Sequence, residues 1–330
     1  MNEVLPNIIL ILAKLALVLG FALTLAAYLV LAERKILGRM QMRHGPNRVG
    51  PFGMLQPLAD LIKLLCKEDL IPDKADRPIF MLAPAIPVIT ALLAFAVIPF
   101  GPPVVFFGRE IPLVICGSDI GVLYLFALSS LAVYGVALAG WASASKYALL
   151  GGLRAMAQMI SYELAMGLAI VPVVMTARSF SLTAIVEAQR PLPNLLVHPL
   201  AFLIFLIAIM AESKRTPFDM PEAENELVAG FHTEYSGMRF GMFFVGEYLN
   251  LIVLGAMLTL LFLGGWHGPL LPAACWFILK VLAVAFFFIW VRGTLPRLRY
   301  DQLMALGWKV LVPLGLLNIL ATASWLIWRG

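Results

Sequence analysis

Long apolar runs recur along the whole chain, and they limit its possible folds more than any other feature. The first run covers residues 8–31, and several others also exceed the roughly 18 residues that a bilayer-spanning helix needs. A signal peptide does not explain them, because the first run is too long and further runs continue to the last residues. The mean hydropathy of +0.93 agrees. We therefore expect an integral membrane protein.

The apolar runs predict an all-α, polytopic fold with about eight transmembrane helices. Residues 1–330 are expected to form a single integral membrane domain. The segment 101–119 is also apolar, but prolines and glycines interrupt it, so we expect a covered surface loop there. The expected spans are 5–32, 79–100, 120–142, 153–176, 195–211, 238–263, 273–291 and 308–328.

Lysines and arginines follow the first, third, fifth and seventh expected spans. The loops on the other side carry little beyond Arg109, Arg178 and Arg190. Because cationic loops stay in the cytoplasm, we expect loops 33–77 and 212–238 on that side and both termini on the outer side. The net charge of +5 is therefore a sign of topology, and nothing in the sequence suggests a nucleic acid partner.

Cysteines and histidines show no pattern typical of a metal or redox centre. The three cysteines, Cys66, Cys116 and Cys275, are single and far apart, and the four histidines are scattered. No glycine-rich phosphate loop follows a predicted strand. We therefore expect no metal site and no nucleotide site of that kind in this chain.

The first large loop has two parts. ERKILGRMQMRHGPNRVGPFG alternates basic residues with glycine and proline, which allow sharp turns and close approach of the backbone, so a bound ligand or partner surface is expected. MLQPLADLIKLLCKED places Leu55, Leu58, Ile62 and Leu65 at helical intervals, which predicts an amphipathic helix along the membrane face. A helix that packs on the bundle and binds no ligand explains the same pattern.

The second large loop, TPFDMPEAENELVAGFHTEYSG, concentrates carboxylates. Asp219 and Glu222 around Pro221 are typical of a helix start, where acids suit the positive end of the dipole. That role does not require the other acids of the loop, and their crowding favours protonation of some of them. A solvated acidic face remains an alternative. These other acids are Glu224, Glu226 and Glu234.

Two further carboxylates lie inside expected spans. Glu163 is near the middle of the fourth span, and Glu247 lies on one stripe of the sixth span with Phe240 and Phe244. A charged side chain inside a bilayer costs at least about 2–3 kcal/mol, so such residues usually have a function. A structural hydrogen bond between helices is the alternative. Glu212 lies at the cytoplasmic end of the fifth expected span.

The acids together suggest a series that descends from the cytoplasmic loop to mid-membrane. Carboxylate chains of this kind mark proton or ion routes in membrane proteins. We assign no role to the two lysines within spans, Lys14 and Lys280. The members of the expected proton conduit are Glu163, Glu212, Glu222, Glu224, Glu226, Glu234 and Glu247.

Four long motifs carry a resemblance to a known family over nearly the whole chain. They are AERKILGRMQMRHGPNRVGPFGMLQPLADLIKLLCKED, LAVYGVALAGWASASKYALLGGLRAMAQMISYE, PFDMPEAENELVAGFHTEYSGMRFGMFFVGEY and LPRLRYDQLMALGWK. In this order they resemble the H subunit family of the bacterial proton-pumping NADH:quinone oxidoreductase, respiratory complex I. The same family includes NADH dehydrogenase subunit 1 of mitochondria.

The resemblance implies a membrane protein that encloses a quinone chamber together with hydrophilic partner subunits. FMN and iron–sulfur clusters would lie in those partners, quinone would be the substrate, with ubiquinone expected for this bacterial type, and the location would be the bacterial inner membrane. The same glutamates would form the conduit to the pumping subunits, other small membrane-arm subunits would adjoin, and no catalytic acid is expected in this chain. The expected quinone-binding residues are Arg34, Asp60, Phe240, Phe244 and Arg292.

Two other functions stay open at this point. One is the membrane anchor of a related energy-conserving hydrogenase, although the form of the acidic loop favours the quinone enzyme. The other is a free-standing ion-coupled transporter, for which acids and lysines within spans are equally suitable. The sequence shows no convincing internal repeat of the kind that such transporters often contain.

Overall fold

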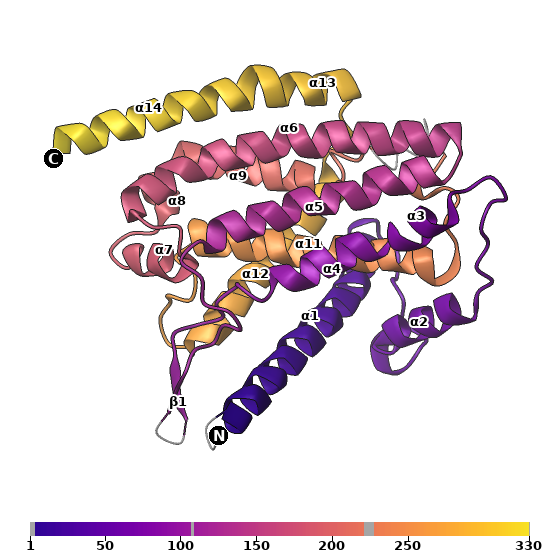
Figure 1. Cartoon of the computed structure of the whole chain (residues 1–330), viewed down its shortest axis with the longest axis horizontal. Helices are drawn as coiled ribbons and strands as arrows, with labels where there is room; N and C mark the ends of the chain where they lie inside the picture. Colours follow the sequence, from indigo (N-terminus) through magenta and orange to yellow (C-terminus); the bar gives the residue numbers. More distant parts are fainter. Residues whose placement is uncertain (1–3, 107–108, 221–227, 330) are drawn as a thin grey trace.

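The computed structural model describes residues 4–106, 109–220 and 228–329 (Figure 1). The predicted all-α membrane fold is confirmed, because the described residues are mostly helical and seven helices among them are long and apolar enough to span a membrane. The remaining expected span, 195–211, contains a shorter apolar helix. The carboxylates Glu222, Glu224 and Glu226 lie outside the described residues.

The spanning helices follow the expected order along the chain. Lipid offers no hydrogen-bond partner for backbone N–H and C=O groups. Each apolar run therefore forms a helix, in which these groups bind one another. The helices are α1 (Val4–Met40), α3 (Arg77–Leu82) with α4 (Ala85–Ala94), α5 (Gly121–Ala142), α6 (Lys146–Ala177), α9 (Pro199–Glu212), α11 (Gly237–Leu261), α12 (Ala273–Thr294), and α13 (Tyr300–Ala305) with the π-helical η3 (Leu306–Leu311) and α14 (Val312–Arg329).

Several expected boundaries were wrong. The first helix continues beyond residue 32 to Met40, and the last begins at Tyr300 instead of 308, because polar residues extend both helices past their apolar runs. The fifth expected span is divided into α8 (Asn194–Val197) and α9. Its break is at His198, whose φ of −126° and ψ of 62° are not helical, since the following proline disfavours helical backbone before it.

Shorter elements fill the loops. They include α2 (Gln56–Cys66), whose leucine face is exposed on this chain, as an amphipathic helix at the membrane interface requires. The expected loop 101–119 contains a hairpin of β1 (Val104–Phe106) and β2 (Arg109–Ile111), with Val104 opposite Ile111. The remaining short elements are η1 (Pro51–Gly53), α7 (Leu182–Ala188) and η2 (Gly230–His232).

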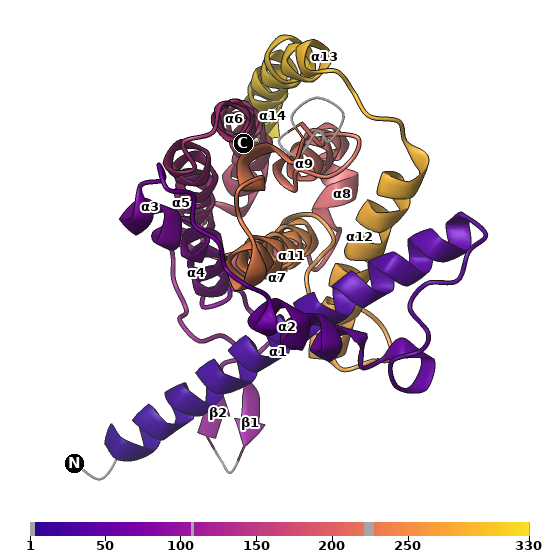
Figure 2. The ribbon, with the colours of Figure 1, turned by 90° about the vertical axis from the view of Figure 1, so that its right-hand side faces the viewer.

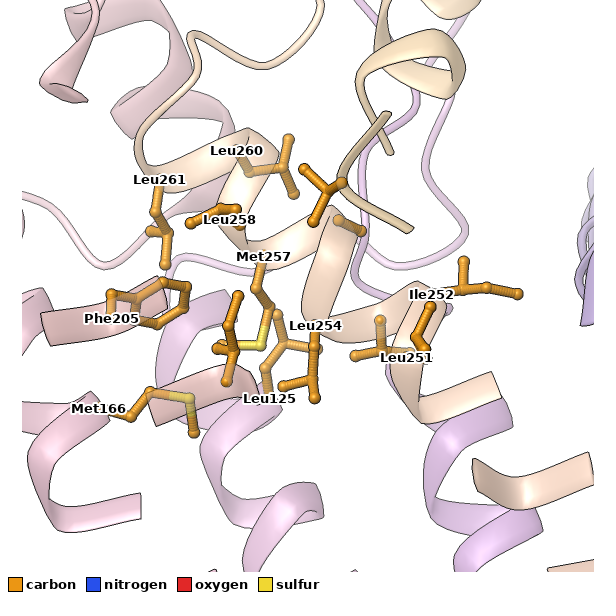
Figure 3. Packing of buried hydrophobic residues seen from close by; sticks show 14 of the residues in the cluster. Leu125, Met166, Phe205, Leu251, Ile252, Leu254, Met257, Leu258, Leu260 and Leu261 are labelled. Carbon is orange, nitrogen blue, oxygen red and sulfur yellow. The ribbon is translucent and has the colours of Figure 1, made fainter. Parts of the chain in front are cut away.

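Helix α11 lies in the middle of a ring of helices (Figure 2). Seventeen of its 25 residues are buried, and Leu254, Met257 and Leu258 pack toward Leu125 and Met166 of the surrounding helices (Figure 3). Both chain ends lie at one end of the bundle, opposite α2 and α3 (Figure 1).

Glycines allow the helices to approach closely. A Cβ atom on Gly135 of α5 would lie 2.6 Å from Cδ of Pro87, and one on Gly246 of α11 would lie 3.0 Å from Cβ of the same proline. A Cβ on Gly140 would lie only 2.6 Å from the carbonyl oxygen of Ala148. Helices α4, α5, α6 and α11 are therefore held at distances that larger residues exclude.

A buried carboxylate joins α1 to three other segments. Glu33 is 4% exposed, and it accepts hydrogen bonds from the guanidinium groups of Arg215 and Arg292 and, at 3.0 Å, from the hydroxyl of Tyr248. Arg215 also lies over the Tyr248 ring, 4.2 Å from its centroid. Burial alone would lower the pKa of Arg215, but the charge of Glu33 raises it above its ordinary value.

The two lysines within spans bind backbone carbonyls. Nζ of Lys280 donates to the carbonyl oxygens of Leu263, Gly265 and His267 at 2.7, 3.0 and 2.8 Å. These groups follow the end of α11, where carbonyls lack helical partners. Nζ of Lys14 donates to the Pro112 carbonyl at 2.9 Å. Both lysines therefore have a structural explanation.

Replacing Gly140 by alanine should destabilise the protein, because the new Cβ atom meets backbone that cannot rotate away. We expect a loss of about 1–3 kcal/mol in the free energy of unfolding, measured by denaturant titration in detergent. Gly167→Ala in α6 is the control, since its Cβ would meet Phe126 at an ordinary 3.9 Å. Equal stability of the two variants would contradict the packing argument.

Glu33→Gln should cost about 3–5 kcal/mol, because it leaves two arginines near a neutral amide in a buried place. The same measurement on Asp301→Asn provides the control, since the ion pair of Asp301 with Arg299 is exposed and should contribute less than about 1 kcal/mol. If both substitutions proved equally mild, Glu33 would not hold these segments together.

Candidate functional site

An internal cavity lies between α4, α5, α6, α9, η2 and α11. Most of its wall is apolar, with Leu125, Leu128 and Met257 among the lining residues. Water has access to about 50 Å³ of it, and one water molecule needs about 10–15 Å³ on this measure, so a short chain of waters fits. The polar residues that line the cavity are Thr90, Ser129, Glu212, Ser213, Lys214, His232, Glu247 and Asn250.

Glu212 reaches the cavity from the last turn of α9. It is 1% exposed, and its Oε1 accepts a hydrogen bond from the Ser129 hydroxyl at 3.3 Å. Among the described residues no donor reaches Oε2. The end of α9 is held by Gln158 of α6, whose Nε2 donates to the carbonyls of Ala211 and Phe218 at 2.8 Å each. Glu212 therefore has one oxygen available to water in the cavity.

Glu163 is connected to this group through the next residue of α5. The Ser130 hydroxyl donates to Glu163 at 2.5 Å, while Ser129 donates to Glu212. Successive residues on a helix point about 100° apart, so the two serines reach carboxylates on two different helices, α6 and α9. Glu163 and Glu212 are also within electrostatic range of each other. Adjacent serines of α5 thus each bind one of two predicted acids.

Glu247 enters the same cavity from α11, one turn before Asn250. Its nearest charges include Arg215, Lys214, Arg292 and Glu33. The cavity therefore lies beside the Glu33 cluster, and Glu247 belongs to both. Glu212 and Glu247 therefore line one cavity, while Glu163 lies within electrostatic range of Glu212.

His232 and Lys214 form the basic part of the lining. Burial, and secondly the Lys214 ammonium, lower the pKa of His232 to about 4, so this ring is neutral at pH 7. The ring lies against Phe240 and Phe244, with centroids 5.3 and 6.4 Å away. Nζ of Lys214 is 5.6 Å from the centroid of the Phe231 ring. The cavity thus holds a cation, a neutral imidazole and two carboxylates.

The predicted quinone-binding residues occupy two places. Nη1 of Arg34 on α1 lies 2.7 Å from Oδ2 of Asp60 on α2, and both side chains are partly exposed. Phe240 and Phe244 form a tilted pair with centroids 4.7 Å apart, and Phe244 lines the cavity. Arg292 binds Glu33, so its guanidinium belongs to the Glu33 cluster.

One described member of the predicted conduit is not joined to the others. Glu234 is half-buried between η2 and α11, and it is not among the described residues that line the cavity. Glu222, Glu224 and Glu226 fall outside the described residues, so their place in the series stays a prediction.

Several residues of the site were missed by sequence reasoning. Ser129 and Ser130 carry no charge, and His232 is a single histidine in a loop. None of the three therefore stood out as a candidate site residue. Glu33 and Arg215 were visible only as neighbours of Arg34 and Lys214. Their partners are more than 180 positions away along the chain, and no local pattern predicts such pairing.

Nothing in the described residues forms a metal site, since no three His, Cys, Asp or Glu side chains gather suitably. The cysteines are free thiols on the surface of this chain. The chemistry that the site supports is proton binding and transfer among carboxylates, hydroxyls and water.

Comparison with known proteins shows the family of the chain. The family model of NADH dehydrogenase matches residues 13–323. The NADH-quinone oxidoreductase H subunit of Syntrophotalea carbinolica is 84% identical over the full length of both chains. An H subunit of the same enzyme from Syntrophobacter fumaroxidans is 65% identical over 97% of each chain, and one from Geobacter metallireducens is 65% identical over 99% of each. The chain therefore belongs to the NADH dehydrogenase family.

Proposed function

We propose that the chain is a membrane subunit of an NADH-quinone oxidoreductase that forms part of the quinone site and couples quinone reduction to proton translocation. One observation carries the coupling part of this proposal. Glu212 and Glu247 share a cavity with room for water, and Glu163, which is bound by the serine next to the one that binds Glu212, lies within electrostatic range of Glu212. Such a track moves protons by short transfers between neighbouring groups.

The quinone would lie at the end of the bundle that carries α2. The Arg34–Asp60 pair and the leucine face of α2 offer a charged and an apolar contact near the membrane surface. Phe240 and Phe244 would form the inner wall, and Arg292 would act through Glu33. Quinone, with ubiquinone as the expected species, would be the substrate, and the protein groups that protonate it would belong to a partner subunit.

Partner subunits would supply the electrons. FMN and iron–sulfur clusters would be bound there, because NADH oxidation needs redox groups that the three separate cysteines of this chain are not arranged to hold. Loops 33–77 and 212–238 would form the docking face for these hydrophilic subunits, and small membrane-arm subunits would pack in the bilayer. We place the complex in the bacterial inner membrane, with both termini on the periplasmic side.

Coupling follows from electrostatics in a region of low dielectric. Two-electron reduction of a quinone leaves negative charge that attracts two protons, and this charge acts strongly on carboxylates beside the chamber. Glu247 is placed to respond first, since it lies on α11 within one turn of Phe244. Glu212 and Glu163 would pass the change toward the pumping subunits.

The two alternative functions receive less support. The family assignment and identities of 65–84% to proteins named as H subunits of NADH-quinone oxidoreductase favour that complex over a hydrogenase anchor. A free-standing transporter is favoured less for the same reason, since these relatives are named as subunits of a larger enzyme.

Glu163→Gln and Glu247→Gln should each reduce proton translocation per NADH oxidised on the order of tenfold, because an amide neither takes up nor releases a proton. The ratio is measured in membrane vesicles that contain the whole complex. Glu187→Gln, whose carboxylate pairs with Arg190 on the surface, is the control and should pump normally. A normal ratio in both test variants would remove these acids from the route.

Arg34→Ala should raise the KM for quinone up to about tenfold and leave proton translocation per electron pair unchanged, because it acts on binding alone. The KM is measured with a soluble quinone in detergent. Arg299→Ala removes an arginine that is more exposed, at 79% against 50% for Arg34, from an ion pair and should have no effect on KM. An unchanged KM in Arg34→Ala would place the quinone elsewhere.

A further inference from the structure

We infer that Lys214 is a positioning residue of the proton route, supplying positive charge that favours the ionised forms of the cavity carboxylates Glu212 and Glu247 during proton transfer. The inference rests on the proposed function, since it assigns a role within that route. Its evidence is independent of the quinone site and comes from the place, backbone and surroundings of Lys214.

Lys214 lies where it can act on both acids at once. It is the second residue after α9, and it lines the cavity together with Glu212 and Glu247. Its ammonium is within electrostatic range of both carboxylates and of His232. The Phe231 ring, 5.6 Å from Nζ, limits where the ammonium can move.

The backbone at Lys214 is costly for a lysine. Its φ of +55° is in the left-handed region, and its N–H donates to the Ala211 carbonyl at 3.1 Å. Helices usually end with glycine in this conformation, because a side chain there is strained. A lysine at this position therefore has a cost that its ammonium must offset.

Among the described residues that line the cavity, the other side chains do not supply this charge, although Arg215 and Arg292 act on Glu247 from the neighbouring Glu33 cluster. Helix α9 contributes Glu212, α11 contributes Glu247, α4 and α5 contribute hydroxyls, and η2 contributes His232, which is neutral at pH 7. Arg215 points to Glu33 and is bound there. Among the described residues that line the cavity, Lys214 is the one lysine or arginine.

Two carboxylates in one low-dielectric cavity repel each other, so without a cation one of them stays protonated. A site that stays protonated cannot accept the next proton. Lys214 would oppose this by lowering the free-energy cost of ionising each acid. Lys214 itself neither gains nor loses a proton, so each proton that leaves one cavity acid is taken up by the next acid or by water.

A purely structural role makes a different prediction. Lysine near a helix C-terminus also stabilises the helix dipole, and that effect alone would explain a cation here. Glycine separates the two roles, because it fits the left-handed backbone and removes only the charge and its side chain. Lys214→Gly should therefore fold at least as well as the parent if the cavity charge is the main function.

The test uses the whole complex in membrane vesicles, with NADH oxidation and proton translocation measured together. We expect Lys214→Gly to lower the ratio of protons to electrons on the order of tenfold, and Lys214→Arg to restore most of it. Lys214→Asn, which also tolerates left-handed backbone, should behave like Lys214→Gly. Lys146→Ala, which removes an exposed positive charge outside the cavity, should pump normally.

Each other outcome would overturn the inference. A normal ratio in Lys214→Gly would show that the charge is dispensable, and an equally low ratio in Lys214→Arg would point to the shape of lysine. Failure of both Gly and Asn variants to assemble, with Arg intact, would make the role structural. If Glu247→Gln is impaired while Lys214→Gly is normal, only this inference fails; if both are normal, the proposed route fails.

Discussion

The contact between Glu33 and two arginines is the interaction on which the remaining structure depends. A carboxylate at 4% exposure is tolerated only because Arg215, Arg292 and Tyr248 all donate to it. These donors come from the loop after α9 and from α12 and α11, so one charge holds α1 against three separate segments. The same loop carries Lys214 directly after Glu212, and its position therefore depends on Glu33.

Close helix packing builds the cavity beside this cluster. Pro87 of α4 packs against Gly135 of α5 and against Gly246 of α11, which brings the three helices near one another. The acids then face a space too small for a large ligand but large enough for water. Proton transfer between acids and quinone binding near α2 would thus occur in neighbouring but different places, and a charge change in one would reach the other through Glu247 and Arg215.

Much of the fold was predictable, whereas little of the site's geometry was. Apolar runs identified the spans because each needs a helix of a certain length, but they misplaced the ends at Met40 and Tyr300, where polar residues continue the helix. Glu163 and Glu247 stood out because charge is costly inside a bilayer. The serine pair did not, since a hydroxyl in a helix usually binds its own backbone and gives no signal of a partner helix.

The sequence by itself determined the class of the protein, the order of its apolar helices, its family, and which acids lie within apolar segments. Those properties follow from hydropathy and local spacing, which are written along the chain. Only the tertiary structure decided that Glu212 and Glu247 share a cavity, that Glu33 is paired twice, and that Lys214 lies beside both cavity acids. Such contacts join residues far apart in sequence, and they depend on how the helices pack, which no local pattern encodes.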